Sequence, residues 1–187
     1  MWHTDPVEIL GFITGALCVW LLAIQNIWTW PIGIANNIFY IVVFLYAGLY
    51  GDAGLQVVYI VLAVYGWWIW LHPGAQSELP VAKTSQRQWI WLILVTGAAA
   101  LILRTFLADF TPSTVPAWDG LTTAMSLAAT WGQCKKLLES WWIWIAVDII
   151  YIPLYVYKGL RVTALLYFIF LLLCIAGLRA WRRAATA

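Results

Sequence analysis

The chain has 187 residues, of which 64% are hydrophobic and only 10% are charged, and its formal net charge is +2. A soluble domain of this size needs more polar surface than this composition supplies, so the chain is expected to lie largely in lipid. The few Lys and Arg residues form no basic stripe with interleaved aromatic rings. This pattern argues against nucleic acid as a partner.

Seven apolar runs are long enough to cross a bilayer. A helix needs about 20 apolar residues to span a hydrocarbon core of about 30 Å, and lipid satisfies no backbone polar group. Each run is therefore predicted to be a membrane helix, the fifth being the most polar. In chain order the runs are Val7–Asn26, Pro31–Tyr50, Ala53–Leu71, Gln88–Leu107, Trp118–Lys135, Trp141–Tyr157 and Val162–Ala180.

Two hydrophilic connections divide these helices, and their charges predict the orientation. His72–Arg87 is expected to be an extended, solvated connection, and Asp109–Pro116 is a second break. Seven Lys and Arg residues fall on the side that holds the C-terminus and three on the other side. The positive-inside rule then places the C-terminus in the cytoplasm and the N-terminus outside.

Tryptophan and tyrosine residues collect near the ends of the apolar runs, where an amphipathic ring lies well at the level of the lipid headgroups. We therefore expect most of them to form interfacial belts. The groups are Trp28/Trp30, Trp67/Trp68/Trp70, Trp89/Trp91 and Trp141/Trp142/Trp144.

The chain also matches itself when it is shifted by 111 positions. The shift brings Asn37 onto Asp148, and its identical matches are Trp20/Trp131, Tyr40/Tyr151, Tyr46/Tyr157, Gly48/Gly159, Leu49/Leu160 and Trp70/Trp181. A repeat in one orientation follows, because a single linking helix between two units of three helices restores the direction of the chain. The prediction is one all-α membrane domain, 1–187, with repeats at about 7–71 and 118–180 and a linking helix at about 88–107.

Such a 3+1+3 repeat places a substrate site between its halves, near the middle of the membrane. Asp148 is the clearest candidate, since a carboxylate near the bilayer centre costs about 2.5 kcal/mol or more unless it faces the bundle interior or water. Helical spacing places further polar and aromatic residues on the faces that would enclose a cavity. The candidate substrate-binding residues are Trp30, Asn36, Asn37, Tyr40, Gln56, Tyr59, Trp131, Trp144, Asp148 and Tyr151.

These polar residues have a second interpretation, in which they hold helices together by hydrogen bonds. The sequence contains no Walker loop, nucleophile elbow or HExxH motif, so no catalytic residue and no enzyme activity are predicted. The three cysteines have no metal-ligand spacing, and neither a metal nor a cofactor is expected.

Several segments resemble the PnuC-type vitamin transporters. They are residues 28–40 (WTWPIGIANNIFY), Leu49–Tyr50, Leu55–Gln56, Tyr65–Trp68, Trp118–Asp119, Trp144–Asp148 and Tyr157–Leu160. The resemblance implies seven core helices in a 3+1+3 arrangement similar to the SWEET sugar transporters, often assembled as a trimer in the bacterial inner membrane. It also implies facilitated diffusion of a small aromatic vitamin, with trapping by a separate cytoplasmic kinase.

The leading hypothesis is a uniporter for nicotinamide riboside. Its pyridinium ring would lie between Trp and Tyr faces, Asn37 and Gln56 would bind ribose hydroxyls, and Asp148 would balance the positive ring. Thiamine or riboflavin is the alternative substrate within the family. A ligand-binding or assembly subunit without transport of its own is the alternative from another class, and an intramembrane enzyme is a third.

Overall fold

The computed structural model describes every residue except 1–5, 47–49, 75–77, 112–114, 158–160 and 187. The described residues form seven helices, which confirms the all-helical prediction, and their ends lie within four residues of the predicted ends. They are α1 (Pro6–Ala23), α2 (Thr29–Tyr46), α3 (Tyr50–Leu71), α4 (Gln86–Phe110), α5 (Pro116–Cys134), α6 (Ser140–Tyr157) and α7 (Arg161–Ala184).

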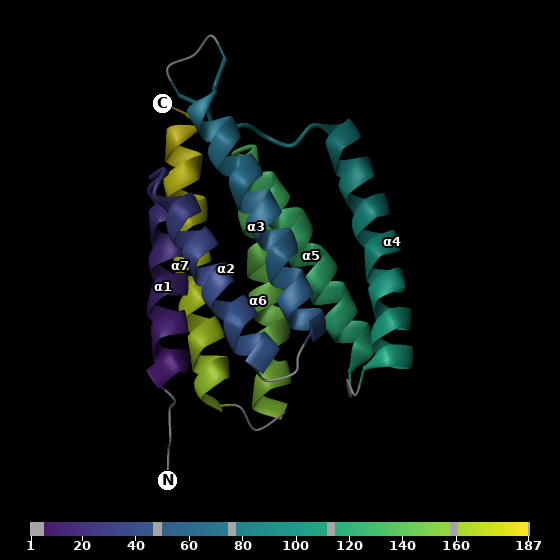
Figure 1. Cartoon of the computed structure of the whole chain (residues 1–187). Coiled ribbons are helices and arrows are strands. Elements are labelled where there is room, and N and C mark those ends of the chain that lie inside the picture. Colours follow the sequence, from purple (N-terminus) through teal and green to yellow (C-terminus); the bar gives the residue numbers. More distant parts are fainter. Residues whose placement is uncertain (1–5, 47–49, 75–77, 112–114, 158–160, 187) are drawn as a thin grey trace.

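Six of these helices form a ring. Each helix packs against the next in the order α1, α2, α3, α5, α6 and α7, and α7 closes the ring on α1. In the described part of the chain, α4 packs against α5 alone and stands at the edge of the bundle (Figure 1). The ring order places α1–α3 opposite α5–α7, with α4 outside.

Contacts in the two halves correspond at the offset of 111 residues. The rings of Trp30 and Trp70 meet edge to face at 5.3 Å and 89°, and their counterparts Trp141 and Trp181 do so at 5.4 Å and 89°. The offset also pairs Gly66 with Gly177, and a Cβ atom added at either glycine would lie 2.6 Å from Cζ2 of the tryptophan that faces it. These matched contacts support the predicted repeat.

Five helices are long and apolar enough to span a membrane, judged over the described residues: α2, α3, α4, α6 and α7. The described apolar part of α1, Leu10–Ala23, is shorter. α5 does not qualify because it carries Thr, Ser and Gln side chains, several of which are buried. Its polar residues face neighbouring helices, so α5 needs fewer apolar residues than a helix surrounded by lipid.

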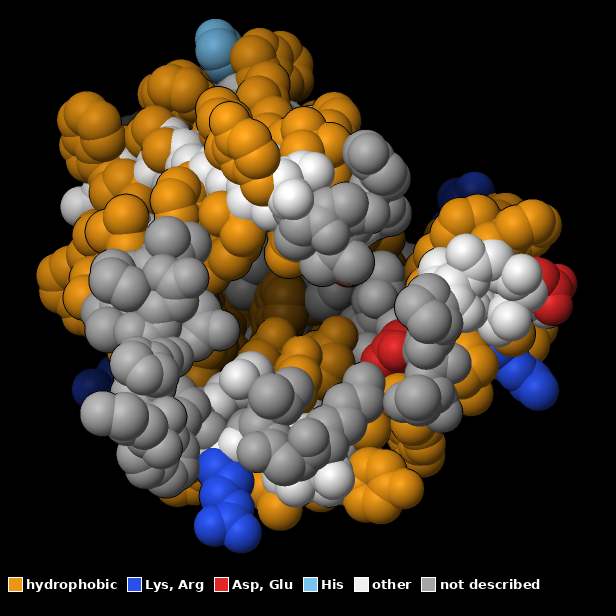
Figure 2. Space-filling model, turned by 60° about the horizontal axis from the view of Figure 1, so that its bottom comes forward, with side chains coloured by type: hydrophobic (Ala, Val, Ile, Leu, Met, Phe, Trp, Pro, Cys, Tyr) orange, Lys and Arg blue, Asp and Glu red, His pale blue; other side chains and the backbone are white. Residues whose placement is uncertain are grey.

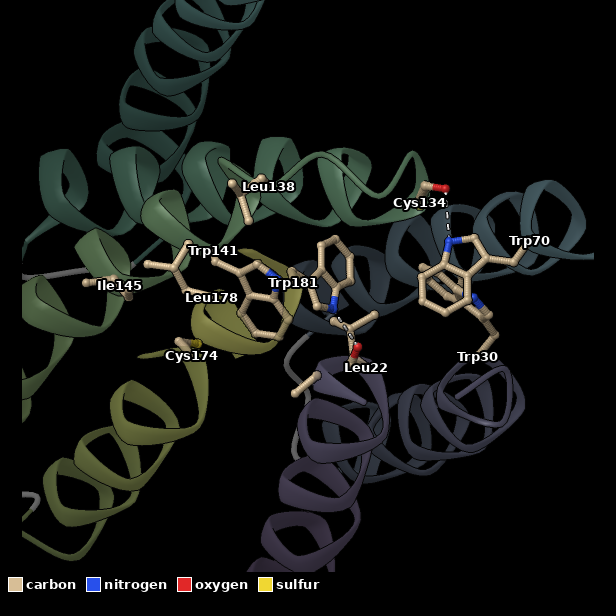
Figure 3. Packing of buried hydrophobic residues seen from close by; sticks show 12 residues of the cluster. Leu22, Trp30, Trp70, Cys134, Leu138, Trp141, Ile145, Cys174, Leu178 and Trp181 are labelled. Atoms are coloured by element: carbon tan, nitrogen blue, oxygen red, sulfur yellow. Dashed lines mark hydrogen bonds between the residues drawn. The ribbon is translucent and has the colours of Figure 1, made fainter. Parts of the chain in front are cut away.

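The belt interpretation is wrong for Trp70 and Trp141, which are buried. Trp30, a candidate site residue, is buried as well, whereas Trp28 and Trp68 are well exposed as a belt requires. The buried rings lie with Trp181 in the apolar core at one end of the bundle (Figure 3). Sequence position near a helix end does not distinguish the two roles, because inward and outward faces alternate within a single turn.

The connection between α3 and α4 is also less solvated than expected. Its backbone pairs with the turn between α5 and α6 through two hydrogen bonds, from Ala82 N to Lys136 O (3.0 Å) and from Leu138 N to Ala82 O (2.9 Å). The Glu139 carboxylate accepts hydrogen bonds from the backbone and the hydroxyl of Thr84, both at 2.7 Å. The connection therefore fixes the start of α4 against the second half of the molecule.

Candidate substrate cavity

A cavity of about 340 Å³ lies inside the ring, and all six ring helices contribute to its wall. Most of its lining residues form pairs at the offset of 111: Val19/Thr130, Leu22/Gln133, Trp30/Trp141, Gly33/Trp144, Asn37/Asp148, Gln56/Tyr167, Tyr59/Phe170 and Ala63/Cys174. The remaining lining residues are Gly15, Cys18, Thr29 and Asn36. The cavity thus lies where the two halves face each other, as the repeat predicts.

The pairing is not chemically symmetric. Asn37 in the first half corresponds to the acidic Asp148, and Gly33 corresponds to the bulky Trp144. One side of the cavity therefore offers neutral hydrogen-bonding groups with space beside a glycine, and the other offers a carboxylate with an indole ring. Such a wall orients an asymmetric ligand.

Seven of the ten predicted site residues line this cavity. They are Trp30, Asn36, Asn37, Gln56, Tyr59, Trp144 and Asp148.

Tyr40 and Tyr151 do not line the cavity. Tyr40 packs against Gly11 of α1, where its ring occupies the space that a Cβ atom would need. Tyr151 belongs to a tyrosine cluster, with ring centroids 5.4 Å from Tyr155 and 4.8 Å from Tyr167. Both predicted positions lie next to the site in sequence, but their side chains pack between helices.

The prediction for Trp131 is wrong for this cavity. Thr130 and Gln133 direct the inner face of α5 towards the cavity, so the helical rotation of about 100° per residue turns Trp131 to another face. Trp131 lines a separate groove between α3, α4 and α5, and Lys135 Nζ lies 4.6 Å from its ring centroid.

Two of the lining residues make bonds between helices as well. The side-chain amide of Asn36 on α2 donates to Thr14 Oγ1 on α1 at 2.5 Å. The Tyr59 hydroxyl on α3 and Ser126 Oγ on α5 are 2.5 Å apart and join the two halves. The alternative role in holding helices together therefore has direct support for Asn36 and Tyr59.

Asp148, unlike Asn36 and Tyr59, has a side-chain oxygen that no other helix satisfies. Asp148 is 2% exposed, and the Cys174 thiol donates a hydrogen bond to its carboxyl group, yet its Oδ2 atom has no hydrogen-bond partner in the protein. Among the described residues, the other buried side-chain polar atoms without a partner are the indole nitrogens of Trp30, Trp141 and Trp144. All four residues line the cavity. Buried polar groups are normally satisfied, so one acceptor and three donors mark a place that a polar ligand would complete.

Some lining residues were missed, including Trp141, Tyr167 and Cys174. Trp141 was assigned to a belt and the other two resemble ordinary membrane residues. The repeat offset of 111 could have identified them, because it pairs these three residues with Trp30, Gln56 and Ala63 of the first half.

The two ends of the cavity differ. Figure 2 views the end of the molecule opposite the C-terminus and shows a hollow in the middle of that face. At the other end lies a group of four tryptophans, which we call the tryptophan quartet (Figure 3). Their rings contact one another in the spatial order Trp30, Trp70, Trp181 and Trp141. We call this end of the cavity the closed end.

Side-chain hydrogen bonds join the two halves at the closed end. The indole of Trp70 donates to Cys134 O at 3.2 Å, and that of Trp181 donates to Leu22 O at 3.1 Å. Lys136 Nζ donates to Gln25 Oε1 at 2.9 Å and lies 4.4 Å from the Trp70 ring centroid. Burial lowers the pKa of Lys136, and the negative charge of Glu78 partly opposes that change.

A ring of apolar helices around a small polar and aromatic cavity is the architecture of a multi-pass membrane transporter. The chain matches the family model described as "Nicotinamide mononucleotide transporter" over residues 5–183. It therefore belongs to the nicotinamide mononucleotide transporter family, and it is a transporter and not an enzyme.

Individual relatives agree with this assignment. The chain is 24% identical over 207 residues to "Nicotinamide riboside transporter PnuC" of Escherichia coli (strain K12), covering 96% of this chain and 86% of the relative. It is 28% identical over 189 residues to "Riboflavin/roseoflavin transporter RibM" of Streptomyces davaonensis, covering 97% and 84%. These matches confirm the resemblance to the PnuC family seen in the sequence.

The fold also matches a solved structure described as "Crystal structure of the Vitamin B3 transporter PnuC". The TM-score is 0.74 at 23% sequence identity, and the match covers 94% of this chain and 80% of that structure. At this level of identity the match establishes the fold.

Proposed function

We propose that this protein carries nicotinamide riboside across the bacterial inner membrane by facilitated diffusion, and that a separate cytoplasmic kinase traps the substrate. The observation that carries the proposal is the Asp148 carboxyl group, buried in the wall of the cavity with one oxygen free of protein hydrogen-bond partners. A carboxyl group among indole rings favours a flat aromatic cation such as the pyridinium ring of nicotinamide riboside. The PnuC relatives support this choice of substrate.

The two sides of the cavity would hold the two parts of this ligand. The pyridinium ring is placed beside Trp144 and Asp148, where the carboxylate balances its charge and the indole provides a π face. The ribose is placed beside Asn37 and Gln56, whose amides both donate and accept hydrogen bonds. The indole donors without partners would bind the carboxamide or hydroxyl oxygens.

Transport would proceed by movement of the halves around this site. The open hollow faces the end opposite the C-terminus, and the tryptophan quartet seals the other end. With the C-terminus in the cytoplasm, as the distribution of Lys and Arg predicts, the described conformation opens outward. Passage to the cytoplasm requires the hydrogen bonds of the closed end to break.

The family resemblance also supports a homo-oligomer, with a trimer as the proposed state. Its mass in a mild detergent, measured by light scattering after correction for bound detergent, tests that state.

Riboflavin is the second candidate, because the riboflavin transporter of Streptomyces davaonensis is 28% identical to this chain over nearly its whole length. Riboflavin has a large neutral ring system, so it would gain little from the Asp148 carboxylate. Thiamine, the other alternative, has a cationic ring but no ribose for Asn37 and Gln56.

Binding and transport by the purified protein test the proposal in two steps. Quenching of tryptophan fluorescence by nicotinamide riboside, thiamine and riboflavin identifies the ligand, and we expect nicotinamide riboside to bind most tightly. Proteoliposomes without an ion gradient and without kinase should then equilibrate labelled nicotinamide riboside. Binding without equilibration would indicate a ligand-binding subunit, whereas preference for riboflavin or thiamine would move the protein to another branch of the family.

A further inference from the structure

A groove larger than the substrate cavity lies on the outside of the ring. It is a groove of about 980 Å³ between α3 and α4, with α5 as its floor, and we call it the outer groove. It exists because α4 packs against α5 without contacting α3 in the described part of the chain. Its position separates it from the substrate cavity, and the two share no lining residue.

The outer groove has two chemically different parts. One end is lined by Arg87 and Lys135 together with Ser85 and Gln88, which form the capping box at the start of α4. The rest is lined mainly by aliphatic and small residues, among them Leu92, Val95, Ala99, Leu127 and Ala128, together with the aromatic rings of Trp91 and Trp131. A cationic, hydrogen-bonding end that continues into an apolar channel matches a molecule with an anionic head and a hydrocarbon tail.

The length of the groove fits one lipid leaflet. The lining residues on α4 run from Ser85 to Ala99, which at 1.5 Å per residue corresponds to about 21 Å. Half of a bilayer, including its headgroup region, is about 20–22 Å thick. The groove therefore extends from the membrane surface to about the bilayer centre.

From this charge distribution and length we propose that the outer groove binds an anionic phospholipid. Its phosphate contacts Arg87 and Lys135, and its acyl chain lies along α5 between α3 and α4. The orientation proposed above places the cationic end in the cytoplasmic leaflet, where anionic lipids attract basic residues. The bound chain fills the space that separates α4 from α3 and holds α4 in its position beside the transport ring.

Native mass spectrometry of the full-length protein, titrated with phosphatidylglycerol or phosphatidylcholine, tests this proposal. We expect tighter retention of phosphatidylglycerol. Each basic residue near a membrane surface contributes about fivefold to anionic lipid binding, so the Arg87→Ala/Lys135→Ala variant should weaken it by roughly thirtyfold. The control Arg182→Ala/Arg183→Ala removes two charges from the end of α7, neither of which lines the groove, and should leave phosphatidylglycerol binding nearly unchanged.

A second pair of variants tests the apolar channel. Ala99→Trp places an indole in the groove and should displace the lipid, whereas Ala98→Trp, at an exposed position outside the groove, should not. Helical circular dichroism confirms that each variant folds. Equal retention of both lipids by the unmodified protein would overturn the proposal. So would a change of oligomeric state in Ala99→Trp with unchanged lipid binding, which would identify the groove as a contact between copies.

Discussion

Lys136 Nζ donates a hydrogen bond to Gln25 Oε1 at 2.9 Å, and the two residues are separated by the repeat offset of 111 positions. Both have left-handed backbones, with φ of 57° at Gln25 and 49° at Lys136. Positive φ is uncommon for residues other than glycine, so its occurrence at equivalent positions shows that each half ends its first helix with the same turn. The bond joins these two turns at the closed end.

The first prediction concerns the other bonds of the closed end. Trp70→Phe removes the donor to Cys134 O while keeping an aromatic ring, and a buried hydrogen bond contributes about 1 kcal/mol. We expect the closed end to open about five times more often. The measurement is the rate at which a soluble thiol reagent labels Cys134 in a Cys18→Ala/Cys174→Ala background.

Trp68→Phe is the matched control, because Trp68 lies on the same helix but is 60% exposed. Its labelling rate should equal that of the parent. An unchanged rate in Trp70→Phe would mean that this bond does not hold the closed end together.

The second prediction concerns the glycines behind the cavity tryptophans. An alanine methyl at Gly66 or Gly177 would lie 2.6 Å from Cζ2 of Trp30 or Trp141. Overpacking of this kind costs about 1–3 kcal/mol, so both variants should have a lower melting temperature. They should also bind substrate more weakly, because the displaced rings line the cavity.

Gly54→Ala is the control on the same helix as Gly66, since no atom lies within 4 Å of an added methyl there. Differential scanning fluorimetry and ligand titration should show near-normal values for this variant. If all three alanine variants behave alike, the close approach of glycine and tryptophan does not shape the site.

The third prediction separates the two tryptophans that the sequence offered as equivalent candidates. Trp144→Ala should lower substrate affinity by about tenfold, since base–aromatic stacking contributes about 1–3 kcal/mol. Trp131→Ala should change affinity by less than about twofold, because Trp131 lies in the outer groove. Fluorescence or calorimetric titration compares them, and a similar loss in both would contradict the position assigned to Trp131.

The number of helices, their order and the burial of Asp148 could be predicted because a bilayer imposes strong rules on length and on buried charge. The offset that pairs Asn37 with Asp148 likewise identified one residue from each half that lines the cavity. These features depend on the spacing of residues along the chain, which can be read from the sequence alone.

The direction of individual aromatic side chains could not be predicted in the same way. Trp141 and Trp142 are neighbours in a run of aromatic residues, yet Trp141 is fully buried and Trp142 is 48% exposed. Both faces of a membrane helix are apolar, so composition gives no inward direction when lipid and protein interior are alike. The packing of the helices decides it, as it does for Trp131.

The charge of Asp148 provides the most direct test of the proposed function. Binding of nicotinamide riboside, whose ring is cationic, is compared with binding of its reduced dihydro form, whose ring is uncharged, in the parent and in Asp148→Asn. The account predicts that the variant loses roughly tenfold or more in affinity for the cation, as expected when one partner of a buried charge pair is removed, with little change for the neutral form. Equal effects on the two ligands, or no effect on either, would contradict the proposal that Asp148 recognises a positive aromatic ring.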